Sequence, residues 1–315
     1  MKKLTEKIAP YASFIGLIVV ALVFILTTGG KMTTPQNLQI LLNQSYTLVL
    51  LAIGVTFIFT HGGIDFSMGS VIALSAMVMG LLINSGVPVI ISGIIGMLAA
   101  VFCSALTGFL TVSLNLPAFI SSLCMMNIAR GIVTTTLSSN KIKISKDLTV
   151  YSTWTIKLIV LLVLFLAAFW ILEYSLIGKY NKAIGENPIA AAQSGVPVKR
   201  YRVYAYIING FCIGVAAFFL LCRTTLVNSG LGMGLELQVI VAVMLGGLAV
   251  KGGARSSVRC ALIGSVIIAI LGNGLVLWGI DAMLVEGAEG LVFLLTIFIA
   301  YLGQRSMSKG KNIGT

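Results

Sequence analysis

The sequence predicts an all-α polytopic membrane protein with about ten transmembrane segments, some of them short or broken. Of its 315 residues, 58% are hydrophobic and only 10% are charged, and the mean hydropathy is +1.06. A water-soluble chain of this length could not cover its surface with so few charges. The apolar residues also fall in runs near the length of about 20 residues that a spanning helix needs. Lipid is therefore the predicted solvent.

The segments follow from these apolar runs, and together they make residues 1–315 a single transmembrane domain. They are 11–28, 38–60, 64–83, 87–112, 117–138, 155–173, 202–222, 236–251, 257–276 and 286–303. The third, fifth and eighth are short or rich in glycine and serine, so we expect them to be bent or to span only part of the membrane. The first follows three lysines, as in a signal peptide. It exceeds the usual apolar region of about 7 to 15 residues, and no A-x-A site follows, which predicts a retained helix.

The lysines and arginines predict the orientation. The net charge of +12 lies in clusters between apolar runs, which is typical of membrane topology and not of a nucleic-acid-binding face. With ten crossings and a cytosolic N-terminus, fourteen of these bases fall inside and six outside, while Arg130 lies in a span. We therefore predict a multi-pass protein of the cytoplasmic (inner) membrane with both termini in the cytosol.

The connector at residues 174–202 is the one long polar stretch, and this orientation places it in the cytosol. Asn187 is suited to cap a helix, and Pro188 has the fixed φ of a first helical position. Ile189 to Ser194 form an alanine-rich body that Gly195 and Pro197 end. Structureless loops of more than about 15 residues are uncommon. The connector is therefore predicted to be a docking surface for a partner.

The next longest connector, Ser138 to Thr155, faces outward in the same scheme. It mixes lysines and an aspartate with Tyr151 and Trp154. Aromatic residues of this kind are typical of a membrane–water interface. The connector is either an amphipathic rim or a landing surface for a partner.

Chemistry within the chain has few candidates. His61 is the only histidine, and the five cysteines form no CxxC pair. A histidine-based catalytic triad or zinc site therefore has almost no residues available, and we expect no catalytic or metal-binding residues. No phosphate-binding loop of the G-x-x-x-x-G-K-[ST] type is present. The acidic residues lie almost entirely at segment ends, which argues against an ion-driven carrier. If ATP drives the protein, a partner subunit binds it.

Two charged residues stand out as gating candidates. Asp65 follows two glycines at the start of the third segment, where a carboxylate can cap a helix or can contact a partner. Arg130 lies inside an apolar segment, where an arginine costs several kcal/mol unless it is solvated or paired. Gly210 and Gly214 form a GxxxG pair, which predicts close packing within one bundle in preference to dimerisation.

A short internal similarity is a weak indication of two related halves. Residues 61–70 read HGGIDFSMGS and residues 251–260 read KGGARSSVRC. They share a glycine pair and a serine five residues after its first glycine, and each follows an apolar run.

Four stretches resemble the permease subunits of carbohydrate ABC importers, the ribose/xylose/galactoside class of the branched-chain-amino-acid/sugar permease superfamily. They are GGIDFSMGSVIALSAMVMG at 62–80, AIGENPIAAAQSGVPVKRYRVYAY at 183–206, GLGMGLELQVIVAVMLGGLAVKGG at 230–253 and GNGLVLWGI at 272–280. The resemblance covers nearly the whole chain in the family's order. Two departures are His61 before the glycine pair and the basic character of KGGARSSVR.

The resemblance implies a transporter subunit that moves a small sugar and is not an enzyme. A helix around Pro188 to Ser194 would dock on a cytosolic ABC ATPase, which alone uses ATP, so this chain needs no cofactor. The other implied partners are a second permease, identical or paralogous, and an extracytoplasmic sugar-binding protein at loops 138–155 and 223–235. The coupling candidates are Glu186, Asn187, Pro188, Ala191, Ala192, Ser194 and Gly195. The signature and gating candidates are Gly62, Gly63, Asp65, Ser67, Gly69, Arg130, Glu236, Gly252 and Gly253.

Other functions are compatible with the same residues. Similar permeases move autoinducer-type furanosyl compounds, nucleosides or branched-chain amino acids. A passive channel or facilitator also lacks an ATP site, although the capped cytosolic helix favours a coupled partner.

Overall fold

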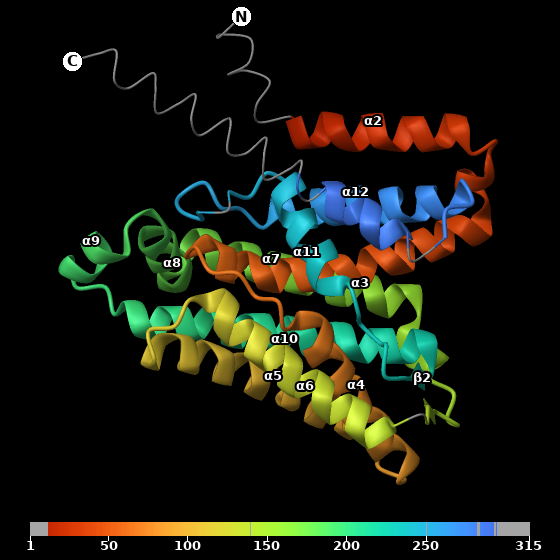
Figure 1. The fold of residues 1–315 in the computed structure, drawn as a ribbon, viewed down its shortest axis with the longest axis horizontal. Coiled ribbons are helices and arrows are strands. Elements are labelled where there is room, and N and C mark those ends of the chain that lie inside the picture. Colours follow the sequence, from red (N-terminus) through yellow and green to blue (C-terminus); the bar gives the residue numbers. More distant parts are fainter. Residues whose placement is uncertain (1–11, 139, 250, 282–283, 293, 295–315) are drawn as a thin grey trace, which may run out of the picture.

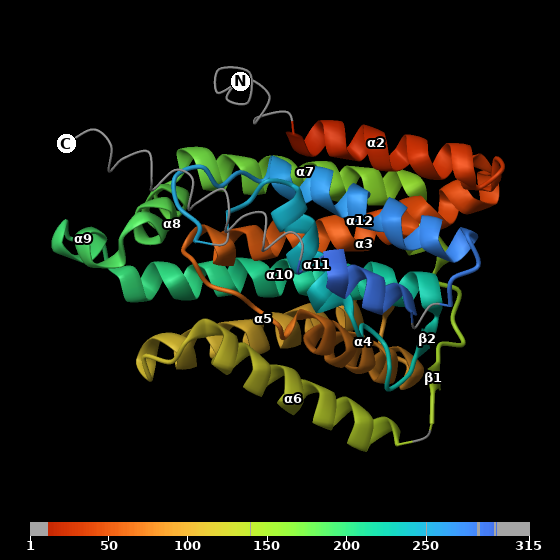
Figure 2. The ribbon, with the colours of Figure 1, turned by 45° about the horizontal axis from the view of Figure 1, so that its top comes forward.

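The computed structural model describes residues 12–138, 140–249, 251–281, 284–292 and 294. Most of the long helices run side by side in roughly one direction, and α6 crosses them at an angle (Figures 1 and 2). The α-helices are α2 (Ala12–Thr27), α3 (Pro35–Thr60), α4 (Met68–Asn84), α5 (Val89–Ser113), α6 (Ala118–Leu137), α7 (Trp154–Tyr174), α8 (Leu176–Glu186), α9 (Pro188–Gln193), α10 (Val198–Thr224), α11 (Leu235–Leu245) and α12 (Arg259–Leu277). Residues 284–292 are also helical. Short elements are the 3-10 turns η2 (Lys31–Thr33) and η3 (Thr149–Ser152) and the strands β1 (Ile142–Lys143) and β2 (Leu226–Val227).

The predicted helical membrane fold is confirmed, whereas the count of ten spans is not. Six described helices are long and apolar enough to cross a membrane: α3, α5, α6, α7, α10 and α12. α2 and α4 have 16 and 17 residues. α11 has 11 residues, about 16 Å at 1.5 Å per residue, too short for a hydrocarbon core of about 30 Å. Most of the segment expected at 286–303 lies outside the described residues.

α3 is the central helix of the bundle. Every residue from Ser45 to Thr60 is buried, because α10, α11 and α12 surround it (Figure 1). α7, in contrast, buries only Lys157, Ala168 and Leu172. One apolar face of α7, with Leu158, Leu162 and Leu166, is exposed, as expected of a helix against lipid.

Small residues allow α10 to pack closely on α5. A Cβ on Gly210 would lie 2.7 Å from the Cα of Val101, and one on Gly214 would lie 2.7 Å from the Cα of Met97. The prediction that this GxxxG pair packs within one bundle is therefore confirmed.

The two ends of the bundle differ in their connections. At one end, β1 pairs antiparallel with β2, Ile142 opposite Val227, and so ties the 138–153 connection to the 225–234 loop. α8 and α9 lie at the opposite end (Figures 1 and 2). In the predicted orientation these are the outer and cytosolic ends, respectively.

Candidate functional site

The connector at 174–202 contains two helices, although the sequence predicted one. α8 is the additional helix, and the Ser175 hydroxyl caps it by accepting hydrogen bonds from the amides of Ile177 and Gly178. The connector is also shorter than expected, because α10 begins at Val198 and not at 202. α8 was missed because glycines interrupt its apolar pattern, at Gly178 and Gly185.

α9 has the predicted caps. The Asn187 side chain accepts hydrogen bonds from the amides of Ile189 and Ala190 at 3.0 and 3.1 Å. Pro188 occupies the first turn, and Gly195 follows the helix with a φ of +82°. Ser194 is the C-cap residue, and its hydroxyl donates to the Ala190 carbonyl. The helix therefore has fixed ends although it has only six residues.

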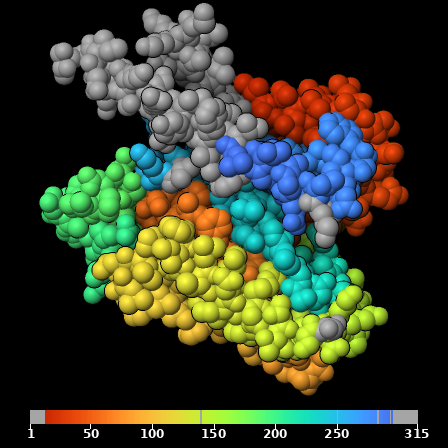
Figure 3. All heavy atoms as spheres, viewed as in Figure 1, coloured from red at the N-terminus to blue at the C-terminus, as the bar shows by residue number. Residues whose placement is uncertain are grey.

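The exposed face of α9 differs from the face the sequence suggested. Ala191 is only 6% exposed and packs toward its own chain, while Ala192 is exposed. Ile189, which the sequence analysis did not single out, is 69% exposed. Figure 3 shows this green region standing at one edge of the molecule. A large apolar side chain at such a tip is typical of a contact with another protein.

Four glycines bring the connector against the ends of two other segments. Glu186 accepts a hydrogen bond from the Ala254 amide at 2.8 Å, and the Gly253 amide donates to the Thr60 carbonyl at 2.9 Å. These contacts require glycine because a side chain would not fit. A Cβ on Gly185 would collide with Thr60, and one on Gly252 with Phe59 and Thr60. A Cβ on Gly253 would collide with the Glu186 carboxylate, and one on Gly62 would lie 3.2 Å from the Lys251 carbonyl oxygen. α8 is thereby joined to the end of α3.

The predicted glycine pairs thus meet in space. Gly62 and Gly252 have positive φ angles of +81° and +70°, and the two similar stretches at 61–70 and 251–260 lie in contact. This contact brings the two stretches together, while the relation between two halves stays a prediction. Gly63 packs against the His61 imidazole. Burial, and secondly the Arg202 guanidinium, lower the pKa of His61 to about 3, so the imidazole is neutral at physiological pH.

Asp65 lies inside the bundle. It is fully buried, and its Oδ1 accepts hydrogen bonds from the Ser67 amide and hydroxyl at 2.8 and 2.7 Å, just before α4 begins. The carboxylate therefore forms a local turn with Ser67, the N-cap residue, and does not make the capping bond to the free amides of α4 that the sequence suggested. The Oδ2 accepts a hydrogen bond from Asn209 of α10 at 2.9 Å, a partner that the sequence did not reveal. Asp65 lies at a segment end, as expected, yet it is buried, and Glu289 is buried as well.

Gly69, Arg130 and Glu236 come together around the loop before α11. Arg130 of α6 donates from Nη1 to the carbonyls of Ser229 and Leu231, both at 2.9 Å. A Cβ on Gly69 would collide with the Glu236 carboxylate and the Gly232 carbonyl. Glu236 Oε2 is buried without a hydrogen-bond partner among the described residues. These residues hold the loop against the start of α4.

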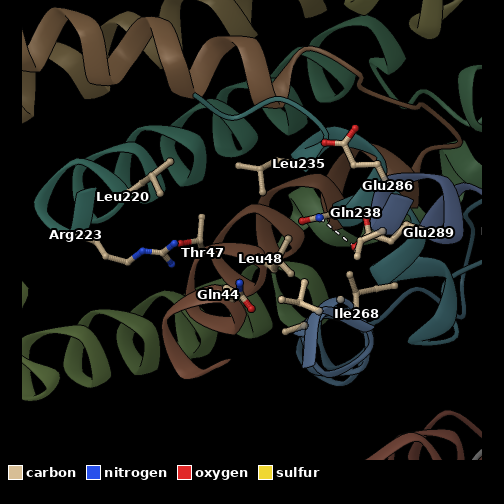
Figure 4. A pocket seen from close by; sticks show the side chains of 14 residues that line it. Gln44, Thr47, Leu48, Leu220, Arg223, Leu235, Gln238, Ile268, Glu286 and Glu289 are labelled. Atoms are coloured by element: carbon tan, nitrogen blue, oxygen red, sulfur yellow. Dashed lines mark hydrogen bonds between the residues drawn. The ribbon is translucent and has the colours of Figure 1, made fainter. Parts of the chain in front are cut away.

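An open cavity of about 310 Å³ lies in the half of the bundle near β2. It is lined by residues of α3, α10, α11, α12 and the helical residues 284–292 (Figure 4). Its polar lining residues are Gln44, Thr47, Arg223, Gln238, Glu286 and Glu289. None of these was singled out from the sequence. Among the described residues there is no cluster of three or more histidine, cysteine, aspartate or glutamate side chains that could hold a metal ion.

Comparisons with known proteins identify the family. The pattern of one family, described as the permease component of branched-chain amino acid transport systems, matches residues 37–301. The chain belongs to this permease family. It is therefore a multi-pass membrane protein of the transporter class.

The relatives cover nearly the whole chain. A ribose import permease of Bacillus subtilis is 30% identical, over 93% of this chain and 92% of its own length. A ribose import permease of Haemophilus influenzae is 28% identical over 94% of each chain. An autoinducer 2 import system permease of Photorhabdus luminescens is 28% identical over 82% of this chain and 80% of its own. No solved structure matches the chain.

Proposed function

We propose that this permease is the membrane-spanning subunit of an ATP-driven importer that moves a small sugar across the cytoplasmic membrane. A separate cytosolic ATPase binds and hydrolyses ATP, and this chain binds no cofactor of its own. A second permease, identical or paralogous, completes the pathway. An extracytoplasmic sugar-binding protein delivers cargo to the connections joined by β1 and β2. Both chain termini lie in the cytosol in this scheme.

The observation that carries the proposal is α9, a short helix with both ends capped, standing at the edge of the bundle (Figure 3). Six residues would not hold a helix in water, so the chain maintains α9 by capping and by burying Ala191. Ile189 remains exposed at 69%. This is the geometry of a small rigid knob that fits a groove on a partner.

The route from this knob into the bundle consists of two hydrogen bonds. α8 ends at Glu186, whose carboxylate accepts a hydrogen bond from the Ala254 amide. The neighbouring Gly253 amide donates a hydrogen bond to the carbonyl of Thr60, the last residue of α3. A displacement of α9 by ATP binding in the partner would therefore reach the central helix, and packed elements convert such displacements into a change between two states.

The test is purification of the tagged chain from its native membrane with its associated proteins. We expect an ABC ATPase to co-purify, and the Ile189→Asp variant to lose it, since a carboxylate would enter the apolar contact. The matched control is Val150→Asp, because Val150 is 66% exposed but lies in η3 at the other end. Sugar uptake that continues without any ATPase would favour the passive channel or facilitator. Uptake of only leucine, a nucleoside or a furanosyl autoinducer would keep the coupling and change the cargo.

A further inference from the structure

The cavity in the half of the bundle near β2 has a composition that ordinary helix packing does not explain. Its residues come from separate parts of the chain: Gln44 and Thr47 from α3, Arg223 from α10, Gln238 from α11, and Glu286 and Glu289 from the helical residues 284–292. Polar side chains inside a membrane bundle are costly, and they mark pathways for polar substrates. Figure 4 shows these side chains around one space with Leu48, Leu220, Leu235 and Ile268.

The polar groups of the cavity are only partly paired. Gln238 Nε2 donates to Glu289 Oε1 at 3.1 Å, and Glu289 is only 4% exposed. The Gln238 carbonyl oxygen is left as an acceptor, while the second Glu289 oxygen can accept as well. Across the cavity, Figure 4 shows Arg223 extending toward Thr47, with Gln44 below them. The carboxylates and the guanidinium group therefore stand on opposite sides of the cavity.

We infer that this cavity is a cargo-binding site for a neutral polyhydroxylated molecule of monosaccharide size. The inference rests on the proposed function and adds a site within the pathway to it. Each hydroxyl group both donates and accepts, so a ring of hydroxyls can satisfy Gln238 and Glu289 on one side and Arg223 on the other. The apolar walls at Leu48, Leu220 and Ile268 suit the C–H faces of a sugar ring.

The charges of the cavity lining disfavour anionic cargo next to the two glutamates. Glu286 and Glu289 oppose a phosphate or carboxylate group. A zwitterionic amino acid has an ammonium group for these carboxylates and a carboxylate for Arg223, so leucine is the competing cargo in the experiments below. The volume of about 310 Å³ lies at the lower end of the range of about 300–1,000 Å³ for small-molecule pockets, which suits one small cargo molecule.

The first experiment measures uptake of radiolabelled ribose by the complete complex, with ATPase and binding protein, in proteoliposomes. Gln238→Leu and Gln44→Leu each remove a hydrogen-bonding group of the cavity, so we expect uptake to fall by about threefold to tenfold. The matched control is Gln39→Leu, because Gln39 also belongs to α3 but is exposed and does not line the cavity. It should transport like the parent protein.

The second experiment reports occupancy directly and does not depend on transport. Thr47→Cys, in a background without the native cysteines, places a thiol in the cavity wall. Ribose should slow its alkylation by a maleimide, whereas leucine should not.

The outcomes separate the site from the function. If the complex imports ribose, but Gln238→Leu matches Gln39→Leu and ribose leaves the alkylation rate unchanged, the cavity is not a cargo site and the proposed function stands. Protection by leucine and not by ribose overturns the assignment to polyhydroxylated cargo. A complex that imports no monosaccharide overturns the proposed cargo and the site together.

Discussion

The end of the bundle that carries α8 and the cavity near its other end are built in opposite ways. At the α8 end, a Cβ on Gly185, Gly252 or Gly253 would collide with neighbouring backbone or carboxylate atoms. At the other end, amide, carboxylate and guanidinium side chains together with apolar ones line about 310 Å³ of open space. Close packing resists compression and so transmits displacement. The two roles proposed for the bundle, coupling and cargo binding, therefore belong to separate regions.

Gly252→Ala tests the packed end and should have the largest effect on stability. The new methyl group would collide with the carbonyls of Phe59 and Thr60, and the residue would keep a φ of +70°. Positive φ and overpacking together predict a loss of about 2–5 kcal/mol, measured as the apparent melting temperature in detergent. Gly86→Ala is the control, since its φ is +96° with nothing within 4 Å. It should lose only about 1–2 kcal/mol; equal losses would show that the packing at Gly252 is unimportant.

Arg130→Ala tests the loop that lies between the two regions. The variant removes the donor to the carbonyls of Ser229 and Leu231. Because Arg130 is only half-buried, we expect a moderate loss of about 1–3 kcal/mol. Limited proteolysis should cut residues 228–234 faster. Arg130→Lys keeps the charge but not the forked donors of the guanidinium, so its stability should lie between that of the parent protein and that of Arg130→Ala. Parental proteolysis of Arg130→Ala would remove the residue from this role.

Glu186→Ala tests the link between the coupling helix and the bundle. The variant loses the hydrogen bond to the Ala254 amide, so we expect sugar uptake per ATP hydrolysed to fall by about threefold, with a stability change below about 1.5 kcal/mol because the site is exposed. Glu186→Gln keeps an oxygen acceptor and should rescue coupling. Glu173→Ala is the matched cytosolic control, since Glu173 pairs with Lys182. Unchanged coupling in Glu186→Ala would place the route from α9 elsewhere.

Gly272→Ala applies the same chemical change to the cavity and should have the smallest effect. A methyl group there would lie 3.2 Å from Glu289 Oε1 and 3.9 Å from Val285, and side-chain atoms can shift into open space. Alanine also favours the helix by up to about 1 kcal/mol over glycine. We expect the free energy of unfolding to stay within about 1 kcal/mol of that of the parent protein, measured through the apparent melting temperature. A loss as large as that of Gly252→Ala would remove the contrast between the two regions.

Features set by neighbouring residues were predictable from the sequence. Asn187, Pro188 and Gly195 determine the start and end of α9, and all their partners lie within a few residues. The apolar runs predicted most helices to within a few positions, because burial in lipid requires only length and hydropathy.

Features that join distant segments were not predictable. Asn209 lies 144 residues from Asp65, and the contact between Gln238 and Glu289 spans 51 residues. Ala191 was predicted as a coupling residue, yet it is buried in the structure, and Ile189 is exposed in its place. The face of a single six-residue helix that points outward depends on what packs beneath it.

The sequence by itself determined that this chain is a helical membrane permease with a capped polar connector, since hydropathy and capping act within one segment. Only the tertiary structure decided which polar side chains share a cavity and which glycines touch. These contacts depend on how separate helices pack, and the residue pattern within one helix does not determine which helices lie beside it.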